Sequence, residues 1–361
     1  MNVIGKYIYG VINSNTAMRL FVPRNFFGEK ECENKNKIVY TISYQDISAV
    51  VSDSEIVDYT YMLKDALAKL LVEHQKVIER IMNVEYTIIP MRLGTFAVHE
   101  SEVRHILAKG YFIIKDIFSK IKDKIEIDMV ATWSDFNAVL KEVAEEREVK
   151  EFKLSLLNKK EGITVNDQMK IGVMVKKALD EKREKYSEEI QNTLRTVSQD
   201  FRVHELMDDK MVANIAFLIN KFMQEDFEKR IEELNNRFAE KLYFRCVGPL
   251  PPYSFYTLEI KRIQFKDLDW ARKKLGFLND SATKSEIKKV RQMLACSLHP
   301  DRNPNTPGIE REFDEVTKAY KVLLEYCQAA EQASQGERCS FNEKEFKRNA
   351  LLVKVRETTT Y

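Results

Sequence analysis

The chain has 361 residues, enough for two or three domains that each bury a core of their own. Hydrophobic residues make up 44% of the chain and charged residues 32%, a composition typical of a globular protein and not of a disordered one. The net charge is only +2, from 58 Lys and Arg against 56 Asp and Glu, which argues against a nucleic-acid partner.

The cysteines and the apolar runs narrow the class of protein further. Five scattered cysteines without a Cys-x-x-Cys pair fit neither a disulfide framework nor a zinc finger, so we expect mostly buried or incidental thiols. No stretch approaches the roughly 18 consecutive apolar residues that span a membrane. Residues 1–10 also lack the basic start and apolar run of a secretory leader. We therefore expect a cytoplasmic protein without membrane contacts, metal or cofactor.

Residues 1–133 predict an α+β domain. The stretch Ser14–Lys37 is polar and is expected to be irregular. An antiparallel sheet with two helices on one face, a ferredoxin-like sandwich, is the simplest way to bury the regular elements. The pattern predicts strands at Gly5–Ile12, Ile38–Ile42, Ile47–Val51, Glu85–Pro90 and Glu126–Trp133, with amphipathic helices at Thr60–Met82 and Ser101–Asp123.

Residues 134–264 predict a more helical segment and a second, abbreviated ferredoxin-like domain. The long charged helix could supply the layer that the strand–strand–helix–strand order lacks, and its charge run fits a solvated face or an interdomain strut. Three prolines in Gly248–Phe255 are expected to stop regular structure. The predicted elements are helices at Ser134–Glu148, Asn166–Thr196 and Met223–Lys241 and strands at Asp200–Leu206, Met211–Asn220 and Leu242–Val247.

Residues 265–328 predict an all-α helical hairpin, followed by a polar tail at 329–361 with one short helix around Phe341–Val355. Thr283 and Glu286 form a capping box at the start of the first helix. An apolar stripe from Ile287 to Leu298 faces a second stripe from Phe313 to Leu323. Pro300, Pro304 and Pro307 open the loop between the two helices, where His299 and Asp301 are exposed at the tip.

This segment resembles a J-domain, the co-chaperone module that stimulates ATP hydrolysis by Hsp70. The resemblance runs from Leu275-Gly276 through His299-Pro300-Asp301 to Phe313-x-x-Val316-x-x-Ala319-Tyr320. It implies that His299, Pro300 and Asp301 contact Hsp70 (DnaK), with Lys288, Lys289 and Arg291 as the basic docking face. Gln292, Met293 and Ser297 stand where many family members carry Lys or Arg, so weaker electrostatic docking is expected.

The chain before residue 256 resembles the gas vesicle protein L/F family. Five segments carry the resemblance in order: Gly5-Lys6-Tyr7-Ile8-Tyr9-Gly10-Val11, Ile47–Ser52, His74-Gln75-Lys76-Val77-Ile78-Glu79, Ile89-Pro90-Met91-Arg92-Leu93-Gly94-Thr95 and Gly248-Pro249-Leu250-Pro251-Pro252-Tyr253-Ser254-Phe255. Leu250 replaces the usual Trp in the last segment. The family fold is two ferredoxin-like sandwiches, as the element order suggests independently.

The resemblance implies a protein of gas vesicle assembly. Such a protein would bind the hydrophobic major shell protein, prevent its aggregation and associate with other minor vesicle proteins, and the J-domain would recruit Hsp70. Pro251, Pro252, Tyr253 and Phe255 are the residues we single out for shell-protein binding, against the alternative that they set the backbone path. Two other functions stay open: a structural wall or nucleation component with a scaffold-only hairpin, and an Hsp70 co-chaperone for an unrelated client.

No catalytic residues are expected. His74 lies on the predicted amphipathic helix next to Glu73, and the other candidates are isolated in the sequence: His99, His105 and His204. A surface or satisfied core histidine is the favoured interpretation of each. The sequence contains no Gly-rich phosphate loop and no nucleophile elbow. The turn at Pro90–Thr95 is expected to set the fold, because Gly and Pro dictate the backbone path there.

Overall fold

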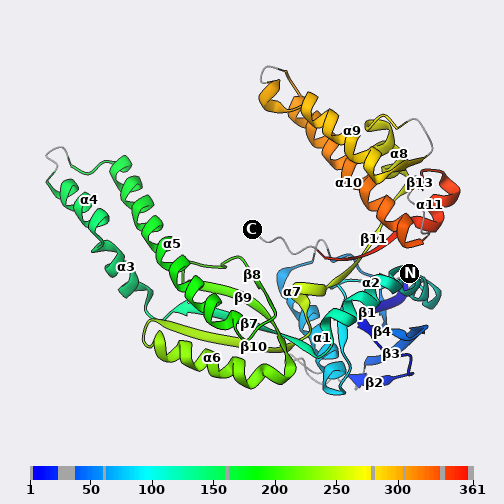
Figure 1. The fold of residues 1–361 in the computed structure, drawn as a ribbon, viewed down its shortest axis with the longest axis horizontal. Helices are drawn as coiled ribbons and strands as arrows, with labels where there is room; N and C mark the ends of the chain where they lie inside the picture. Colours follow the sequence, from blue (N-terminus) through cyan, green and yellow to red (C-terminus); the bar gives the residue numbers. More distant parts are fainter. Residues whose placement is uncertain are drawn as a thin grey trace. The chain divides into compact units, whose positions relative to one another are not determined.

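The structure is a computed structural model of the chain. It describes residues 3–22, 37–59, 62–158, 162–277, 281–303, 306–333 and 338–356. The chain divides into two compact units. Among the described residues, the first unit joins the chain up to Lys120 to Tyr256–Arg356, and the second comprises Ile121–Phe255. The first unit is therefore built from two separate segments of the sequence, because the chain leaves this unit and later returns to it (Figure 1).

The first unit is built on an antiparallel sheet with the order β2-β3-β4-β1-β5, and β6 also pairs with β1. The four main strands follow the order β3-β4-β1-β5. The first strand of the chain, β1, thus lies between β4 and β5, as the first strand of a ferredoxin-like sheet lies between two others. The strands are β1 (Ile4–Ile12), β2 (Arg19–Val22), β3 (Lys37–Tyr44), β4 (Ile47–Glu55), β5 (Ile88–Pro90) and β6 (Phe96–Ala97). Strand β2 corrects the prediction that all of Ser14–Lys37 is irregular; its four residues are too short a run to predict a strand and gain their partner from β3.

Helix α1 (Lys64–Asn83) packs against β1 and β5, and α2 (Glu100–Ile121) follows β6. Both predicted helices are confirmed within a few residues. Gly10 lies so close to β5 that a Cβ atom would stand 2.6 Å from the carbonyl oxygen of Ile89. Gly94 has φ +81° and faces the ring of Tyr59, so the turn at Pro90–Thr95 requires glycine for its path, as predicted.

The second unit is a complete ferredoxin-like domain and not an abbreviated one. Its strands follow the order β10-β7-β9-β8 with antiparallel neighbours. The predicted strand at Glu126–Trp133 exists, but it is the central strand β7 of this sheet and not the last strand of the N-terminal domain. The elements are β7 (Lys124–Trp133), α3 (Phe136–Ala144), α4 (Arg147–Leu157), α5 (Val165–Arg195), β8 (Asp200–Val203), β9 (Met211–Asn220), η2 (Lys221–Met223), α6 (Gln224–Arg237), β10 (Leu242–Leu250) and α7 (Tyr253–Tyr256).

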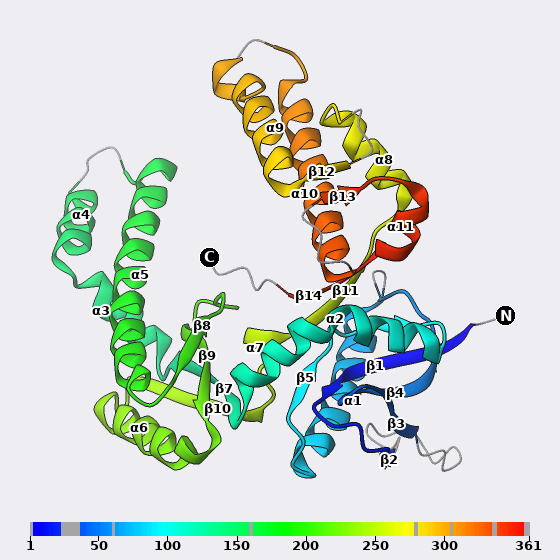
Figure 2. The same ribbon diagram turned by 45° about the vertical axis from the view of Figure 1, so that its right-hand side comes forward.

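One face of this sheet is covered by α5 and α6. Trp133 of β7 meets Tyr186 of α5, which in turn meets Phe238 just after α6. Helices α4 and α5 form an antiparallel pair that extends beyond the sheet (Figure 2). The predicted helix Ser134–Glu148 is in fact two helices, α3 and α4, and α7 follows the prolines where no regular element was expected.

The rest of the first unit is the predicted helical segment with an additional structured tail. Helices α9 and α10 are antiparallel, and Ile287, Val316 and Leu323 are buried between them and α8. The short helix predicted around Phe341–Val355 is present as α11, but the predicted polar tail also contains two strands that were not expected. The elements are β11 (Leu258–Arg262), α8 (Phe265–Lys274), β12 (Ser281–Thr283), α9 (Lys284–Ser297), η3 (Pro300–Arg302), α10 (Ile309–Ala333), β13 (Arg338–Ser340), α11 (Glu343–Asn349) and β14 (Leu351–Val355).

The cysteines correct a second expectation. Cys327 of α10 and Cys339 of β13 form a disulfide, whereas Cys246 and Cys296 are free thiols. The pairing joins two elements of the same small core, and the predicted lack of a disulfide is therefore wrong for this pair. Cys32 lies outside the described residues.

The linker to the helical segment is a two-stranded ribbon of β11 and β14. The backbone of β11 also contacts the N-terminal sheet, where the Arg92 N–H donates to the carbonyl of Leu258 over 2.8 Å. Arg262 donates to the carbonyl of Phe96 over 2.7 Å and pairs with Glu102 of α2 over 2.7 Å. The ribbon therefore fixes the end of β11 to the N-terminal domain, and it contributes to the compactness of the first unit.

Helix α1 also buries a histidine in the core of the first unit. His74 is 2% exposed, and its Nδ1 lies 2.7 Å from the Tyr7 hydroxyl. Burial, with Lys37 nearby, lowers the pKa of His74 from 6.5 to about 4. His74 is therefore a core histidine whose Nδ1 is hydrogen-bonded, whereas its buried Nε2 has no hydrogen-bond partner among the described residues.

We predict acid destabilisation through His74. Between about pH 6.5 and pH 4 the unfolded chain binds a proton at this side chain and the folded chain does not, so stability falls as the pH falls. The slope is at most about 1.4 kcal/mol per pH unit. Urea unfolding across this range should show a flatter pH dependence for His74→Phe than for the wild type. The matched control is the exposed His99→Gln, which should keep the wild-type slope; an unchanged slope in His74→Phe would contradict the assignment.

Candidate functional site

The predicted Hsp70-binding tip lies between α9 and α10. His299 caps the short η3 turn, and its Nδ1 accepts a hydrogen bond from the Asp301 N–H over 3.2 Å. The side chains of His299 and Asp301 are 46% and 88% exposed. The ring of His299 also meets that of Phe313 on α10, with ring centres 5.7 Å apart. One edge of the imidazole is thus fixed against the hairpin while the motif stays accessible.

Asn303 holds this turn on the end of α9. Its side-chain amide donates to the carbonyl of Ser297 over 2.8 Å and to that of His299 over 3.1 Å. Ser297 ends α9, so its carbonyl lacks an intrahelical partner, whereas the His299 carbonyl also accepts from the backbone N–H groups of Arg302 and Asn303. Asn303 therefore sets the direction in which the His299-Pro300-Asp301 turn leaves the helix.

Only part of the predicted basic face on α9 is exposed to solvent. Lys288 and Lys289 are exposed on α9, with no ion pair to another described residue. Arg291 is half-buried, and its guanidinium lies 5.2 Å from the centre of the Tyr320 ring on α10. Arg291 packs the hairpin instead of presenting its full charge to a partner. We therefore propose Lys288 and Lys289 as the main docking cations of α9.

Arg302 is a basic residue at the tip that the sequence reasoning missed. It is exposed, directly follows the motif, and donates to the carbonyl of Cys296 over 3.4 Å. The sequence does show that Arg302 directly follows Asp301, and this position could have indicated a cation at the tip. The tip thus presents a cation beside the motif itself.

The predicted shell-binding residues occupy a different environment. Pro251, Pro252 and Phe255 are buried in the second unit, and Tyr253 is half-buried. The guanidinium of Arg202 lies 5.0 Å from the centre of the Phe255 ring. This burial favours the fold-setting alternative for the loop. A direct role in binding stays a proposal for these four residues.

Ser254 in the same loop is bound to a buried carboxyl group. Its backbone N–H and its hydroxyl donate to the two carboxyl oxygens of Glu126, over 2.9 and 2.7 Å. His204 Nε2 lies 3.1 Å from the same hydroxyl. Because the hydroxyl already donates to Glu126, the three side chains are arranged to hold the loop on β7 and not to activate Ser254 as a nucleophile. Within the described ranges, no group of three or more His, Cys, Asp or Glu residues is placed to hold a metal ion.

The environment of Glu126 raises its pKa. The residue is 1% exposed, and burial is the main cause, followed by the negative charge of Asp128. The two Ser254 donors act in the opposite direction, since they stabilise the ionised form. The balance raises the pKa of Glu126 to about 8.

A family model described as gas vesicle synthesis protein GvpL/GvpF matches residues 5–257, more than half of the chain. The chain belongs to the GvpL/GvpF family. Gas vesicle protein F of Nostoc sp. is 22% identical over 225 residues, which are 60% of this chain and 91% of that protein. The homologue from Dolichospermum flosaquae is 23% identical over 235 residues, 62% of this chain and 95% of that protein.

The solved structures agree with the GvpL/GvpF fold. The crystal structure of GvpF from Anabaena sp. PCC7120 covers 70% of this chain and 98% of its own, with a TM-score of 0.57 at 20% identity. GvpF from Microcystis aeruginosa gives a TM-score of 0.54 over the same shares. The two-domain α+β fold expected from the sequence is thereby confirmed.

The C-terminal segment of this GvpL/GvpF protein carries a fused J-domain. A DnaJ domain model matches residues 274–329. The chaperone protein DnaJ of Chlorobium phaeobacteroides is 50% identical over 46 residues, which are 13% of this chain and 12% of that protein. The predicted J-domain is confirmed, although its matched range stops before β13. In the described part of the chain, no helix has the length and apolar character to cross a membrane.

We predict alkaline destabilisation through Glu126. The unfolded chain releases the proton of this carboxyl group near pH 4.5 and the folded chain near pH 8, so stability falls as the pH rises through this window. Glu126→Gln removes the ionisation and should flatten the dependence, by up to about 1.4 kcal/mol per pH unit. Unfolding of the second unit in urea from pH 5 to 9 measures this. Glu205→Gln, at an exposed position near His204, is the control; equal slopes for both variants would show that Glu126 is already ionised in the folded chain.

Proposed function

We propose that this GvpL/GvpF protein is an assembly chaperone of gas vesicles that works in the cytoplasm. It holds the hydrophobic major shell protein before wall growth, and its J-domain recruits Hsp70 (DnaK) to the held subunit. The observation that carries the proposal is the exposed His299-Pro300-Asp301 turn in a chain whose other domains are those of a gas vesicle protein. Other minor vesicle proteins are further partners of the same assembly.

A holding role requires an exposed apolar surface. A free shell subunit that assembles through apolar helices and strands exposes a large hydrophobic patch, and such patches aggregate. The second unit presents large apolar side chains on the α4–α5 pair. Their exposed fractions range from 51% to 72% at Leu154, Leu157, Ile163, Val165, Met169 and Val173.

The α4–α5 pair is the surface on which we place the shell-protein contact. At Val165, Met169 and Val173 the spacing of four residues puts the side chains along one side of α5. Lys153 and Lys170 are exposed beside this apolar set. Their charges suit a partner whose apolar face is flanked by acidic side chains. The buried Phe255 offers no comparable area.

Fusion to the J-domain puts Hsp70 recruitment and shell-protein binding on the same molecule. A covalent connection gives the second module an effective concentration near the millimolar range without any new contact. The β11–β14 ribbon shortens the free linker further, because the J-domain segment starts directly after a strand bound to the N-terminal sheet. Holding and handover can thus occur on one molecule.

A structural wall or nucleation component with a scaffold-only hairpin is the second candidate. The packing of Arg291 on Tyr320 favours it, because the docking face of α9 loses a cation. The third candidate, an Hsp70 co-chaperone for an unrelated client, shares the J-domain activity and lacks the shell-protein contact. The next two experiments separate the three.

We predict that the full chain suppresses aggregation of the shell protein in the absence of Hsp70. Leu157→Ser with Met169→Ser should weaken this suppression several-fold, because both side chains are about two-thirds exposed and the change removes apolar contact area. Light scattering of diluted shell protein measures the effect.

The matched control is Phe222→Ser, which changes a side chain that is 75% exposed on η2. It should suppress aggregation as well as the wild type does. Equal suppression by all three chains would move the contact away from the α4–α5 pair. Aggregation without any suppression by the wild type would refute the holding role itself.

We predict that the J-domain stimulates the ATPase of the host Hsp70 and that His299→Gln abolishes the stimulation. Exposed charge pairs contribute about 0.2–1 kcal/mol each, so docking through Lys288, Lys289 and Arg302 should be weak and should decline with salt. Steady-state ATP hydrolysis at low and high ionic strength measures both effects.

His299→Gln should leave the helical hairpin folded, because His299 lies outside the buried core of α8, α9 and α10. Near-ultraviolet circular dichroism checks this. Lys344→Gln, on exposed α11 away from the tip, is the charge control and should keep full stimulation. Equal ATPase rates for wild type and His299→Gln at low salt would favour the scaffold function.

A further inference from the structure

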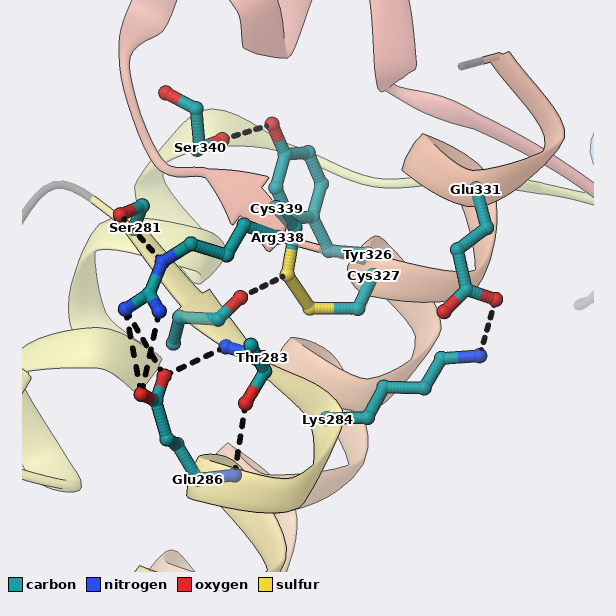
Figure 3. The surroundings of a disulfide bond; sticks show 11 residues. Ser281, Thr283, Lys284, Glu286, Tyr326, Cys327, Glu331, Arg338, Cys339 and Ser340 are labelled. Atoms are coloured by element: carbon teal, nitrogen blue, oxygen red, sulfur yellow. Dashed lines mark hydrogen bonds and ion pairs between the residues drawn. A yellow bond between two sulfur atoms is a disulfide. The ribbon is translucent and has the colours of Figure 1, made fainter. Parts of the chain in front are cut away.

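Two cysteines that have no part in the proposed function join the J-domain to the end of the chain. Cys327 lies on α10 and Cys339 on β13, 12 residues later, with their Cα atoms 5.4 Å apart. The two residues are 1% and 4% exposed. Figure 3 shows their disulfide between α10 and the β12–β13 pair. We call residues 338–356 the C-terminal strap.

The strap is also held here by contacts that do not involve sulfur. Arg338 pairs with Glu286 over 3.2 Å, and Glu286 in turn completes the capping box of α9 (Figure 3). The hydroxyl of Tyr326, next to Cys327, donates to the carbonyl of Ser340 over 2.6 Å. These contacts bring the two thiols together whether or not they are bonded to each other.

The same pocket also suits the reduced form. Cys339 Sγ lies 3.0 Å from the carbonyl oxygen of Ala282 on β12. A thiol at this position can donate a weak hydrogen bond to that carbonyl. Ala282 is fully buried, and Cys339 pairs with it across the two strands. Both oxidation states therefore fit the fold without a change of partner for the strap.

The strap connects this pocket to the ribbon at its other end. After β13 the chain forms α11 and then β14, which pairs with β11. Gln332 of α10 binds both backbone groups of Val353, accepting from its N–H over 3.2 Å and donating to its carbonyl over 2.6 Å. A covalent bond at Cys339 would therefore restrain the strap at one end while the ribbon restrains it at the other.

We propose that Cys327 and Cys339 are a reversible dithiol–disulfide pair that locks the C-terminal strap onto the J-domain. The oxidant is a low-molecular-weight disulfide such as oxidised glutathione. One thiolate attacks the small disulfide and releases a small thiol; the second thiolate then attacks the mixed disulfide and releases the other. Two electrons pass from the protein to the small disulfide, and the two protons leave with the two small thiols.

The surroundings favour this pair over the other described thiols. Cys246 lies on β10 in the second unit, and Cys296 lies near the exposed end of α9. Buried sulfur atoms react with a small disulfide only when β13 separates from β12, so exchange in the folded chain should be slow. Once formed, the disulfide closes a short loop. It lowers the population of the state in which the strap has come away from α10 by on the order of 10- to 100-fold.

The test uses the full chain with Cys32, Cys246 and Cys296 changed to Ser. The protein is equilibrated in buffers of stepped ratios of reduced to oxidised glutathione, quenched with acid and alkylated, and each thiol is quantified by peptide mass spectrometry. Cys327 and Cys339 should lose reactivity together in a single two-electron transition. Trypsin cleavage after Lys344 or Lys347 of α11 should be 10- to 100-fold slower in the oxidised form than in the reduced form.

This comparison needs no destabilising variant, because the two forms have one sequence. Cys339→Ser in the same background is the added control, and its cleavage rate should be independent of the glutathione ratio. Three outcomes would overturn the proposal: both thiols stay reactive at every ratio, glutathione stays attached to one cysteine, or the oxidised and reduced forms are cleaved at the same rate.

Discussion

The pairing of β11 with β14 is the interaction on which the arrangement of the first unit depends. β11 follows the gas vesicle domains directly, and β14 is near the end of the chain, so about 90 residues lie between two strands that hydrogen-bond to each other. The ribbon is attached to the N-terminal sheet at Leu258 and to α2 through Arg262. Without β14, the only backbone pairing of β11 among the described residues would be the bridge of Leu258 to Met91.

This constraint changes how the fusion of the two modules should be understood. J-domains joined by a flexible segment act through local concentration alone. Here the J-domain segment begins and ends on the ribbon, and Lys354 of β14 pairs with Glu259 and Glu325, which belong to β11 and α10. The strap therefore contacts both β11, which follows the GvpL/GvpF domains, and α10 of the J-domain.

Local patterns in the sequence were sufficient for the elements that carry their own signal. The capping box at Thr283 and Glu286 and the apolar stripes of α9 and α10 are short-range features, and both are present as predicted. The J-domain motif could be placed at an exposed turn for the same reason. Helix α1 has the predicted amphipathic pattern, although the sequence left His74 open between the surface and the core.

Features whose partners are distant in the sequence could not be predicted from local patterns. β7 has the pattern of any buried strand, and only its register with β9 and β10 shows that it belongs to the second sheet. β13 and β14 are short, and their partners β12 and β11 are more than 50 residues away in the sequence. Arg291 looks like a docking cation until Tyr320 is seen to face it. Each of these errors concerns a partner that is distant in sequence.

Hydrogen exchange at the paired strands of the ribbon tests this arrangement most directly. Lys261 of β11 and Leu352 of β14 are paired residues of the ribbon, and their amides can be followed in the reduced full-length chain. The ribbon predicts exchange slower than in an unstructured peptide by on the order of 1,000-fold or more at the hydrogen-bonded amides of both strands. Exchange of both strands at the rate of an unstructured linker would show that the J-domain is loosely tethered, and it would contradict the account.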